Sequence, residues 1–126
     1  MRRSDQRRAA VFALYQDEVT GRPAPDGVAD SAPFTRELIA GVEEHREDLD
    51  TEIASLAKGW ELDRIAALEK SILRVAMQEL TSSEDVPAEV AIDEAVEAAK
   101  ELCSAEAPGF VNGILGAFQR DRVATS

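Results

Sequence analysis

Apolar side chains recur three or four positions apart through most of this chain, which places them on one face of an α-helix. Between Arg7 and Val19, for example, the repeating positions are Val11, Leu14 and Tyr15. The same spacing predicts five further helices. The second begins near Ser31, the third covers 46–58, and the fourth runs from Asp63 to about Leu80. The fifth begins between Val90 and Asp93, and the sixth covers 105–121. No segment alternates with period two for long enough to indicate a strand. The pattern therefore predicts an all-α bundle.

Breaker residues separate the predicted helices. Residues 20–27 hold two of the five prolines and read as a linker, and residues 81–87 read as a turn. Gly59 and Trp60 end the third helix, and we expect Trp60 to fill the join between two segments. Asp63 is a candidate N-cap for the long fourth helix.

The last predicted helix is unusually rich in glycine. Gly109, Gly113 and Gly116 are four and three positions apart, so they form one stripe along it. Each glycine inside a helix costs about 1 kcal/mol relative to alanine. The stripe fits either close packing against another backbone or close approach of a flat ligand such as a base. Residues 122–126 are expected to fray.

The composition fits one domain of 126 residues, or two small bundles that share a core. Hydrophobic residues make up 44% of the chain, which is enough for a core without disulfides. Cys103 is the only cysteine, so no internal disulfide can form. No apolar run reaches the length of a membrane span, and the arginine-rich start lacks the apolar part of a secretory signal. These features predict a cytoplasmic protein.

Charge is divided unevenly along the chain. The formal net charge is −11, yet the first eight residues hold four arginines and one aspartate, a side-chain sum of +3. The remaining 118 residues therefore carry −14. A strongly acidic protein is a poor general nucleic-acid binder, because phosphates repel it. The split indicates either local contact with an anion plus a basic protein partner, or a solvated basic tail.

The residues of common enzyme sites are missing. His45 is the only histidine, which excludes a site of several histidines, and Cys103 has no histidine pattern to activate it. The chain has neither the GxxxxGK[ST] nor the GxGxxG motif. We therefore expect no enzymatic activity, no metal and no cofactor.

Arginine and tyrosine on the first helix suggest RNA instead. Single-stranded RNA is bound through its phosphates and through bases that stack on aromatic rings and guanidinium planes. Tyr15 lies two turns beyond Arg8, roughly on the same side of the helix, but it is also in phase with the core positions. Tyr15 could thus be a core residue or a contact. We expect Arg7 and Arg8 to face solvent.

Several ordered stretches resemble the NusB family of bacterial transcription antitermination factors. The combination of the later stretches, in this order and spacing, is specific, and together the matches cover nearly the whole chain. They lie at residues 7–15 (RRAAVFALY), 34–42 (FTRELIAGV), 60–64 (WELDR), 68–80 (LEKSILRVAMQEL), 86–100 (VPAEVAIDEAVEAAK) and 110–115 (FVNGIL).

The resemblance implies one NusB-like all-α domain over 1–126, with six to seven helices in two packed subdomains, 1–58 and 59–126. It also implies binding to the boxA sequence of nascent ribosomal RNA leaders together with NusE, a small-subunit ribosomal protein. The pair would join the elongating RNA polymerase with other Nus factors and suppress premature termination. The arginine end would then meet RNA, and the acidic surface would meet the basic ribosomal protein.

The resemblance also assigns site residues. Phe110 is the preferred contact to a base, and Glu69 is the first choice on the NusE side, with Asp63 and Arg74 beside it. The residues expected to bind RNA are Arg2, Arg3, Arg7, Arg8, Tyr15, Glu106 and Phe110.

The chain departs from the family pattern in four places. Residues 4–6 interrupt the basic run, Glu106 stands where aspartate is common, and Met77 stands where tyrosine is frequent. The segment 20–32 is short, so a helix often found there is expected to be absent or reduced to a turn. Two other functions remain open: an adaptor that binds only protein, and an RNA-binding accessory to a ribosomal RNA methyltransferase. RNA preference, the need for NusE and homodimer formation also remain open.

Overall fold

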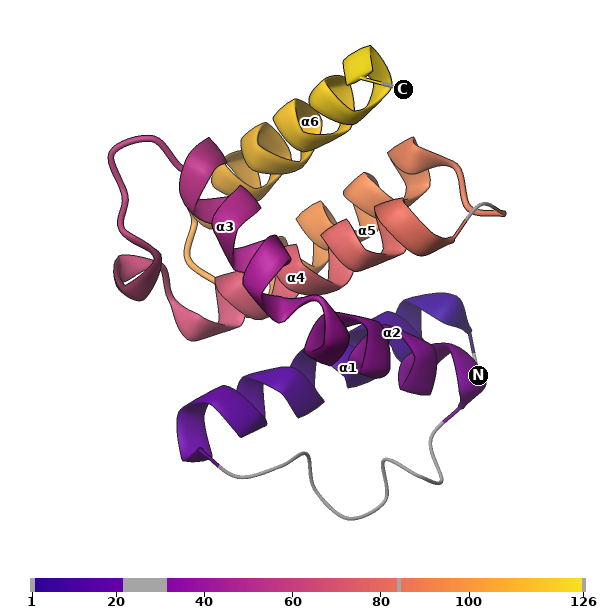
Figure 1. Cartoon of the computed structure of the whole chain (residues 1–126). Helices are drawn as coiled ribbons and strands as arrows, with labels where there is room; N and C mark the ends of the chain where they lie inside the picture. The colour runs from indigo at the N-terminus through magenta and orange to yellow at the C-terminus, as the bar shows by residue number, and fades with distance from the viewer. Residues whose placement is uncertain (1, 22–31, 84, 126) are drawn as a thin grey trace.

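A computed structural model describes residues 2–21, 32–83 and 85–125, and these residues are helical with short connections (Figure 1). The elements are α1 (Arg3–Thr20), α2 (Pro33–Glu44), α3 (Arg46–Leu56), the 3₁₀ turn η2 (Leu62–Arg64), α4 (Ala67–Ser82), α5 (Ala88–Leu102) and α6 (Ala107–Thr125). The described residues form no strand, and the predicted all-α fold class is confirmed.

Helix α4 is the centre of the bundle. Its residues 71–79 are all buried, and a helix that is buried on every side must be surrounded by other elements. Helices α1 and α2 lie together on one side of α4, and α6 lies on the other (Figure 1). The sequence pattern anticipated only one buried stripe on this helix.

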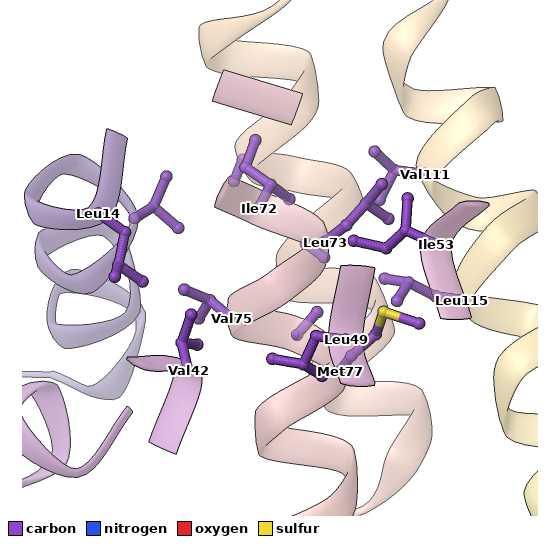
Figure 2. Close-up of a cluster of buried hydrophobic side chains, with 14 of the residues drawn as sticks. Leu14, Val42, Leu49, Ile53, Ile72, Leu73, Val75, Met77, Val111 and Leu115 are labelled. Atoms are coloured by element: carbon purple, nitrogen blue, oxygen red, sulfur yellow. The ribbon is translucent and has the colours of Figure 1, made fainter. Parts of the chain in front are cut away.

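The hydrophobic core joins every α-helix of the described chain into one cluster. Figure 2 shows Leu14 of α1, Val42 of α2 and Ile53 of α3 around α4, with Leu115 of α6. Met77 of α4, which stands where the family often has tyrosine, is fully buried in the same cluster (Figure 2). Full burial of such side chains stabilises the fold by about 1.5–3 kcal/mol each. The proposed division into 1–58 and 59–126 stays a prediction.

Two helix boundaries differ from the expectations. Asp63 lies within η2, so it does not cap α4, whose N-cap position is Ala66. Helix α5 begins at Ala88, directly after Pro87, rather than beyond Val90. The expected start near Ser31 falls outside the described residues, and so does most of the short 20–32 segment.

The end of α6 is also more ordered than expected. The helix continues to Thr125, although residues 122–126 were expected to fray. Arg122 explains the difference, because its Nη1 donates a hydrogen bond to the carbonyl of Leu80 at 2.7 Å. Its guanidinium also lies over the Phe118 ring at 5.6 Å. These contacts tie the last turns of α6 to the end of α4.

Trp60 does not fill a join between segments. It is 56% exposed, and its ring meets Phe110 edge-on, with centroids 6.4 Å apart and planes inclined by 64°. An exposed tryptophan at the start of a turn offers its ring to a partner, whereas a buried one would only fill space.

Candidate functional site

Arg7 lies inside the bundle rather than facing solvent. Its Nε and Nη2 donate hydrogen bonds to the two oxygens of Glu79 at 2.7 and 2.5 Å, and the Glu94 carboxylate lies 3.7 Å from its Nη1. The hydrogen bonds to Glu79 raise the pKa of Arg7 above its ordinary value, against the opposing effect of burial. The expectation of exposure is therefore wrong: Glu79 is only 1% exposed, and a buried carboxylate needs a cation beside it.

The other three arginines near the N-terminus form an outer edge, which we call the arginine edge: Arg2, Arg3 and Arg8. Arg2 is mostly exposed, with its Nε 3.8 Å from the Asp5 carboxylate. Arg3 lies over the Phe34 ring at 4.6 Å and 3.2 Å from Asp85. Arg8 is mostly buried: its side chain is 22% exposed and its Nε is covered, so the expectation that it faces solvent is wrong for most of this side chain. Arg2 and Arg3 keep cationic groups at the surface, as predicted, and each of the three arginines has an acidic neighbour.

An exposed aromatic ring on α1 adds to this edge. Phe12 is 47% exposed and lies one turn after Arg8, so the two side chains share a face of the helix. Tyr15, three positions further on, is half-buried. Sequence reasoning overlooked Phe12, although a signal was present: Val11 and Leu14 define the buried face, and position 12 falls outside it.

A second site is a groove of about 400 Å³ between η2, the start of α4 and the start of α6. We call it the Trp60–Phe110 groove. It brings together Glu69, Glu106 and Phe110, which the resemblance assigned to two different partners. Asp63 is exposed close by in the chain. The residues lining the groove are Trp60, Arg64, Ile65, Ala66, Glu69, Ser104, Glu106, Ala107 and Phe110.

Two carboxylates in this groove repel each other. Burial first, and then the charge of Glu106, raise the pKa of Glu69 above its ordinary value of 4.5. The pKa of the Cys103 thiol is also raised, by burial and then by Glu69, so this thiol is kept protonated and poorly nucleophilic. A cationic group placed in the groove would relieve the repulsion.

Arg74 is part of the scaffold, contrary to its expected place on a partner surface. It is 2% exposed, donates from Nε and Nη2 to Asp50 at 2.8 and 3.1 Å, and donates from Nη1 to Glu18 at 3.2 Å. The Lys70 ammonium lies 2.9 Å from the same Glu18. These pairs connect α1, α3 and α4, so Arg74 offers no donor to a docking protein in this conformation.

The glycine stripe of α6 lies against open space. A Cβ added to Gly109 or Gly113 would meet no atom within 4 Å, and one added to Gly116 would meet only the Arg120 side chain, at 3.4 Å. Close packing of another backbone on the stripe is therefore excluded within the described residues. The surface is open to a ligand.

The arginine edge and the groove lie toward opposite ends of α4. Helix α1 runs antiparallel to α4, because Arg7 contacts Glu79 while Glu18 contacts Lys70. Glu79 and Glu69 are ten residues apart, which corresponds to about 15 Å along a helix. Arg7 and Phe110 thus do not share one pocket. Arg8 points toward the groove side, since its Nε lies 3.0 Å from Glu101, at the end of α5.

The described residues contain neither a metal-binding cluster nor a membrane-spanning helix. Among residues 2–21, 32–83 and 85–125, no three histidine, cysteine, aspartate or glutamate side chains are grouped to hold a metal ion. Within the same ranges, no helix has the length and apolar character needed to cross a membrane.

Comparison with known proteins identifies the family. The NusB family profile matches residues 4–120. A curated relative from Symbiobacterium thermophilum, named transcription antitermination protein NusB, is 40% identical over 138 aligned positions, covering 95% of this chain and 90% of the relative.

Solved structures agree with this match. NusB from T. maritima superimposes with a TM-score of 0.82 at 30% identity, over 100% of this chain and 92% of that one. A structure of antitermination factors NusB and NusE in complex with dsRNA gives 0.79 at 22% identity, over 94% and 96%, a likeness of fold. The family consists of antitermination factors rather than enzymes, which confirms the expectation of a non-enzymatic protein. This chain belongs to the NusB family.

Proposed function

We propose that this protein is an RNA-binding transcription antitermination factor that binds boxA RNA of nascent ribosomal RNA leaders together with NusE. It then joins the elongating RNA polymerase with other Nus factors, in the cytoplasm. The observation that carries the proposal is the 40% identity to an antitermination protein NusB over nearly the full length of both chains. The two surfaces described above have the chemistry that such a role requires.

The RNA surface in this proposal runs along α1. Arg2, Arg3 and Arg8 supply guanidinium groups for phosphates, and Phe12 and Tyr15 supply rings on which unpaired bases stack. Arg7 belongs to this surface indirectly, because its buried contact with Glu79 positions α1 against α4. Three of the four arginines expected to bind RNA thus supply the direct contacts in this proposal.

The partner surface in this proposal is the Trp60–Phe110 groove. Two mutually repelling carboxylates, Glu69 and Glu106, attract a cationic side chain of a basic ribosomal protein. Trp60 and Phe110 offer aromatic edges around that contact. Glu106 therefore suits the NusE side better than the RNA side, because a carboxylate repels phosphate. Phe110 remains available to either partner, and exposed Asp63 extends the acidic surface.

The test is an anisotropy titration of a labelled boxA oligonucleotide and a scrambled one, each with and without NusE. We expect boxA to bind more tightly than the scrambled sequence, and most tightly when NusE is present. Arg3→Gln should weaken binding and reduce the slope of log K against log salt by about 0.7, the value for one phosphate on a single strand. Glu52→Gln, on the exposed side of α3, serves as a control that leaves the slope unchanged.

The protein-binding adaptor is the second candidate, because the arginines of the arginine edge have acidic neighbours within the chain. An adaptor would bind neither oligonucleotide in this titration but would bind NusE in calorimetry. That result would refute the RNA-binding proposal while leaving the partner groove in place.

A further inference from the structure

A row of carboxylates at α5 faces the arginines of α1. Asp85, just before α5, lies 3.2 Å from Arg3, and Glu101, near the end of α5, lies 3.0 Å from Arg8. Between them, Glu94 approaches the buried Arg7. Glu94 and Glu101 are seven residues apart, so they share one face of the helix. The negative side chains follow the positive ones along the same boundary.

Of the three pairs, Arg8–Glu101 is the one in which another anion could most easily replace the carboxylate. Arg7 is locked by two hydrogen bonds to buried Glu79, and Arg3 is also held over Phe34. Arg8, in contrast, lies at a small cavity of about 20 Å³ whose α5 wall consists largely of Ala91, Ala95 and Ala98. The side chain of Glu101 is 58% exposed and that of Arg8 is 22% exposed, with Arg8 Nε covered, so an anion from solvent must displace Glu101 to reach the guanidinium.

We propose that Glu101 acts as an internal competitor for RNA phosphate at Arg8 and thereby sets the sequence-independent affinity of the protein for RNA. This inference rests on the proposed function. A carboxylate and a phosphate accept hydrogen bonds from the same guanidinium donors, so only one of them can occupy the outer face of Arg8. Glu101 is exposed, and Arg8 Nε has no hydrogen-bond partner among the described residues, so the pair is held by charge and can exchange with phosphate without unfolding.

Glu97 provides a matched control. It lies one turn before Glu101 on α5, and its side chain has the same exposed fraction of 58%. Its carboxylate pairs with Lys100 of the same helix at 3.2 Å and has no contact to α1 among the described ion pairs. Glu97→Gln therefore removes the same charge from the same helix while leaving Arg8 paired.

The experiment measures binding of the full chain to a boxA oligonucleotide, to a scrambled oligonucleotide and to a heparin column. We expect Glu101→Gln to raise the affinity for both oligonucleotides by roughly threefold, since exposed ion pairs correspond to factors of about one to five. The two factors should be equal, because phosphate contacts carry no sequence information. Elution from heparin should shift to higher salt. Glu97→Gln should produce less than half of each change.

A double-mutant cycle assigns the effect to Arg8. In an Arg8→Gln background, Glu101→Gln should no longer raise affinity, because the competed guanidinium is gone. Glu101→Asp, which keeps the charge on a shorter side chain, should lie between the wild type and Glu101→Gln. Thermal unfolding of each variant establishes that it is folded before binding is measured.

The outcomes separate this inference from the proposed function. The inference is wrong if Glu97→Gln and Glu101→Gln raise the RNA affinity equally, or if Glu101→Gln still raises it in the Arg8→Gln background. Either result would mean that the affinity depends only on the net charge of the protein. If no variant binds RNA but the heparin difference between Glu101→Gln and Glu97→Gln persists, the proposed function fails and with it the RNA role of Glu101, while competition for an anion at Arg8 stands. If RNA binds with no such difference, the proposed function stands and the inference fails.

Discussion

The two ends of α4 carry acidic side chains in opposite electrostatic surroundings. At the C-terminal end of α4, Glu79 is buried against Arg7 of α1, which donates two hydrogen bonds to it. At the other end, Glu69 faces the carboxylate of Glu106 in an open groove, and its pKa is raised. The Arg7–Glu79 pair, the closed pair, is neutralised within the chain and stabilises the bundle. Glu69 and Glu106, the open pair, have like charges that a cation from a partner could neutralise.

The largest expected effect comes from breaking the closed pair. Arg7→Met leaves Glu79 buried without a cation and should reduce the free energy of unfolding by about 3–5 kcal/mol. Arg8→Met, whose partner Glu101 is exposed, should cost less than about 1 kcal/mol. Urea denaturation of both variants measures the difference.

A double variant sharpens this test. Arg7→Met combined with Glu79→Met removes both charges and should recover most of the lost stability, because an apolar pair of similar size can replace a buried ion pair. If Arg7→Met instead unfolded like the wild type and only weakened RNA binding, Arg7 would be a surface contact and the contrast between the two ends would disappear.

Reversing a charge in the open groove should affect binding rather than folding. Glu69→Lys should lower the affinity for NusE by roughly tenfold or more, since like charges at an interface cost several kcal/mol when close. Glu47→Lys makes the same charge change at an exposed site of α3 and should leave the affinity unchanged. Calorimetry with purified NusE compares them, and equal affinities would remove the groove from the interface.

Adding a methyl group should have opposite effects on stability at two glycines, one in the glycine stripe of α6 and one in α2. Gly113→Ala adds a methyl group that meets no atom within 4 Å, so it should stabilise the fold by about 0.5–1 kcal/mol. Gly41→Ala would place its Cβ against the side-chain amide of Gln78 and should disturb the contact of Gln78 with His45. Thermal unfolding ranks the two variants. If Gly113→Ala also weakens RNA or NusE binding, the stripe is a contact surface.

The smallest expected effect is a pH dependence of Glu69. Its folded-state pKa is raised, so its contribution to stability is fully present below about 4.5 and is lost as the pH rises through the folded-state pKa. Glu69→Gln removes this dependence. The variant should therefore gain stability relative to the wild type at pH 7 but not at pH 4. Unfolding midpoints at the two pH values measure the gain, and a gain of equal size at both would contradict the proposed repulsion.

Local rules accounted for the helices. The spacing of three and four predicted every α-helix of the described chain, because the buried face of a helix recurs with each turn. The wrong predictions concern the ends of the helices. Asp63 has the chemistry of an N-cap but lies in a 3₁₀ turn, and the last turns of α6 persist because Arg122 reaches Leu80, 42 residues earlier in the chain.

The site could be predicted only in part. Glu69, Glu106 and Phe110 were identified through family resemblance, but nothing in their spacing placed them in one groove. Arg7 and Arg74 looked like surface cations, yet each meets a carboxylate that is distant in sequence: Glu79 lies 72 positions from Arg7, and Asp50 lies 24 positions from Arg74.

The amino-acid sequence by itself determined that this protein is a helical bundle with a cationic start and an acidic body. Periodicity and charge are properties of neighbouring residues, so they can be read along the chain. Only the tertiary structure decided which arginines are buried in ion pairs and which remain at the surface. The physical reason is that burial and charge pairing depend on which helices meet in space: Arg7 meets the buried Glu79, whereas Arg8, the next residue, meets the exposed Glu101.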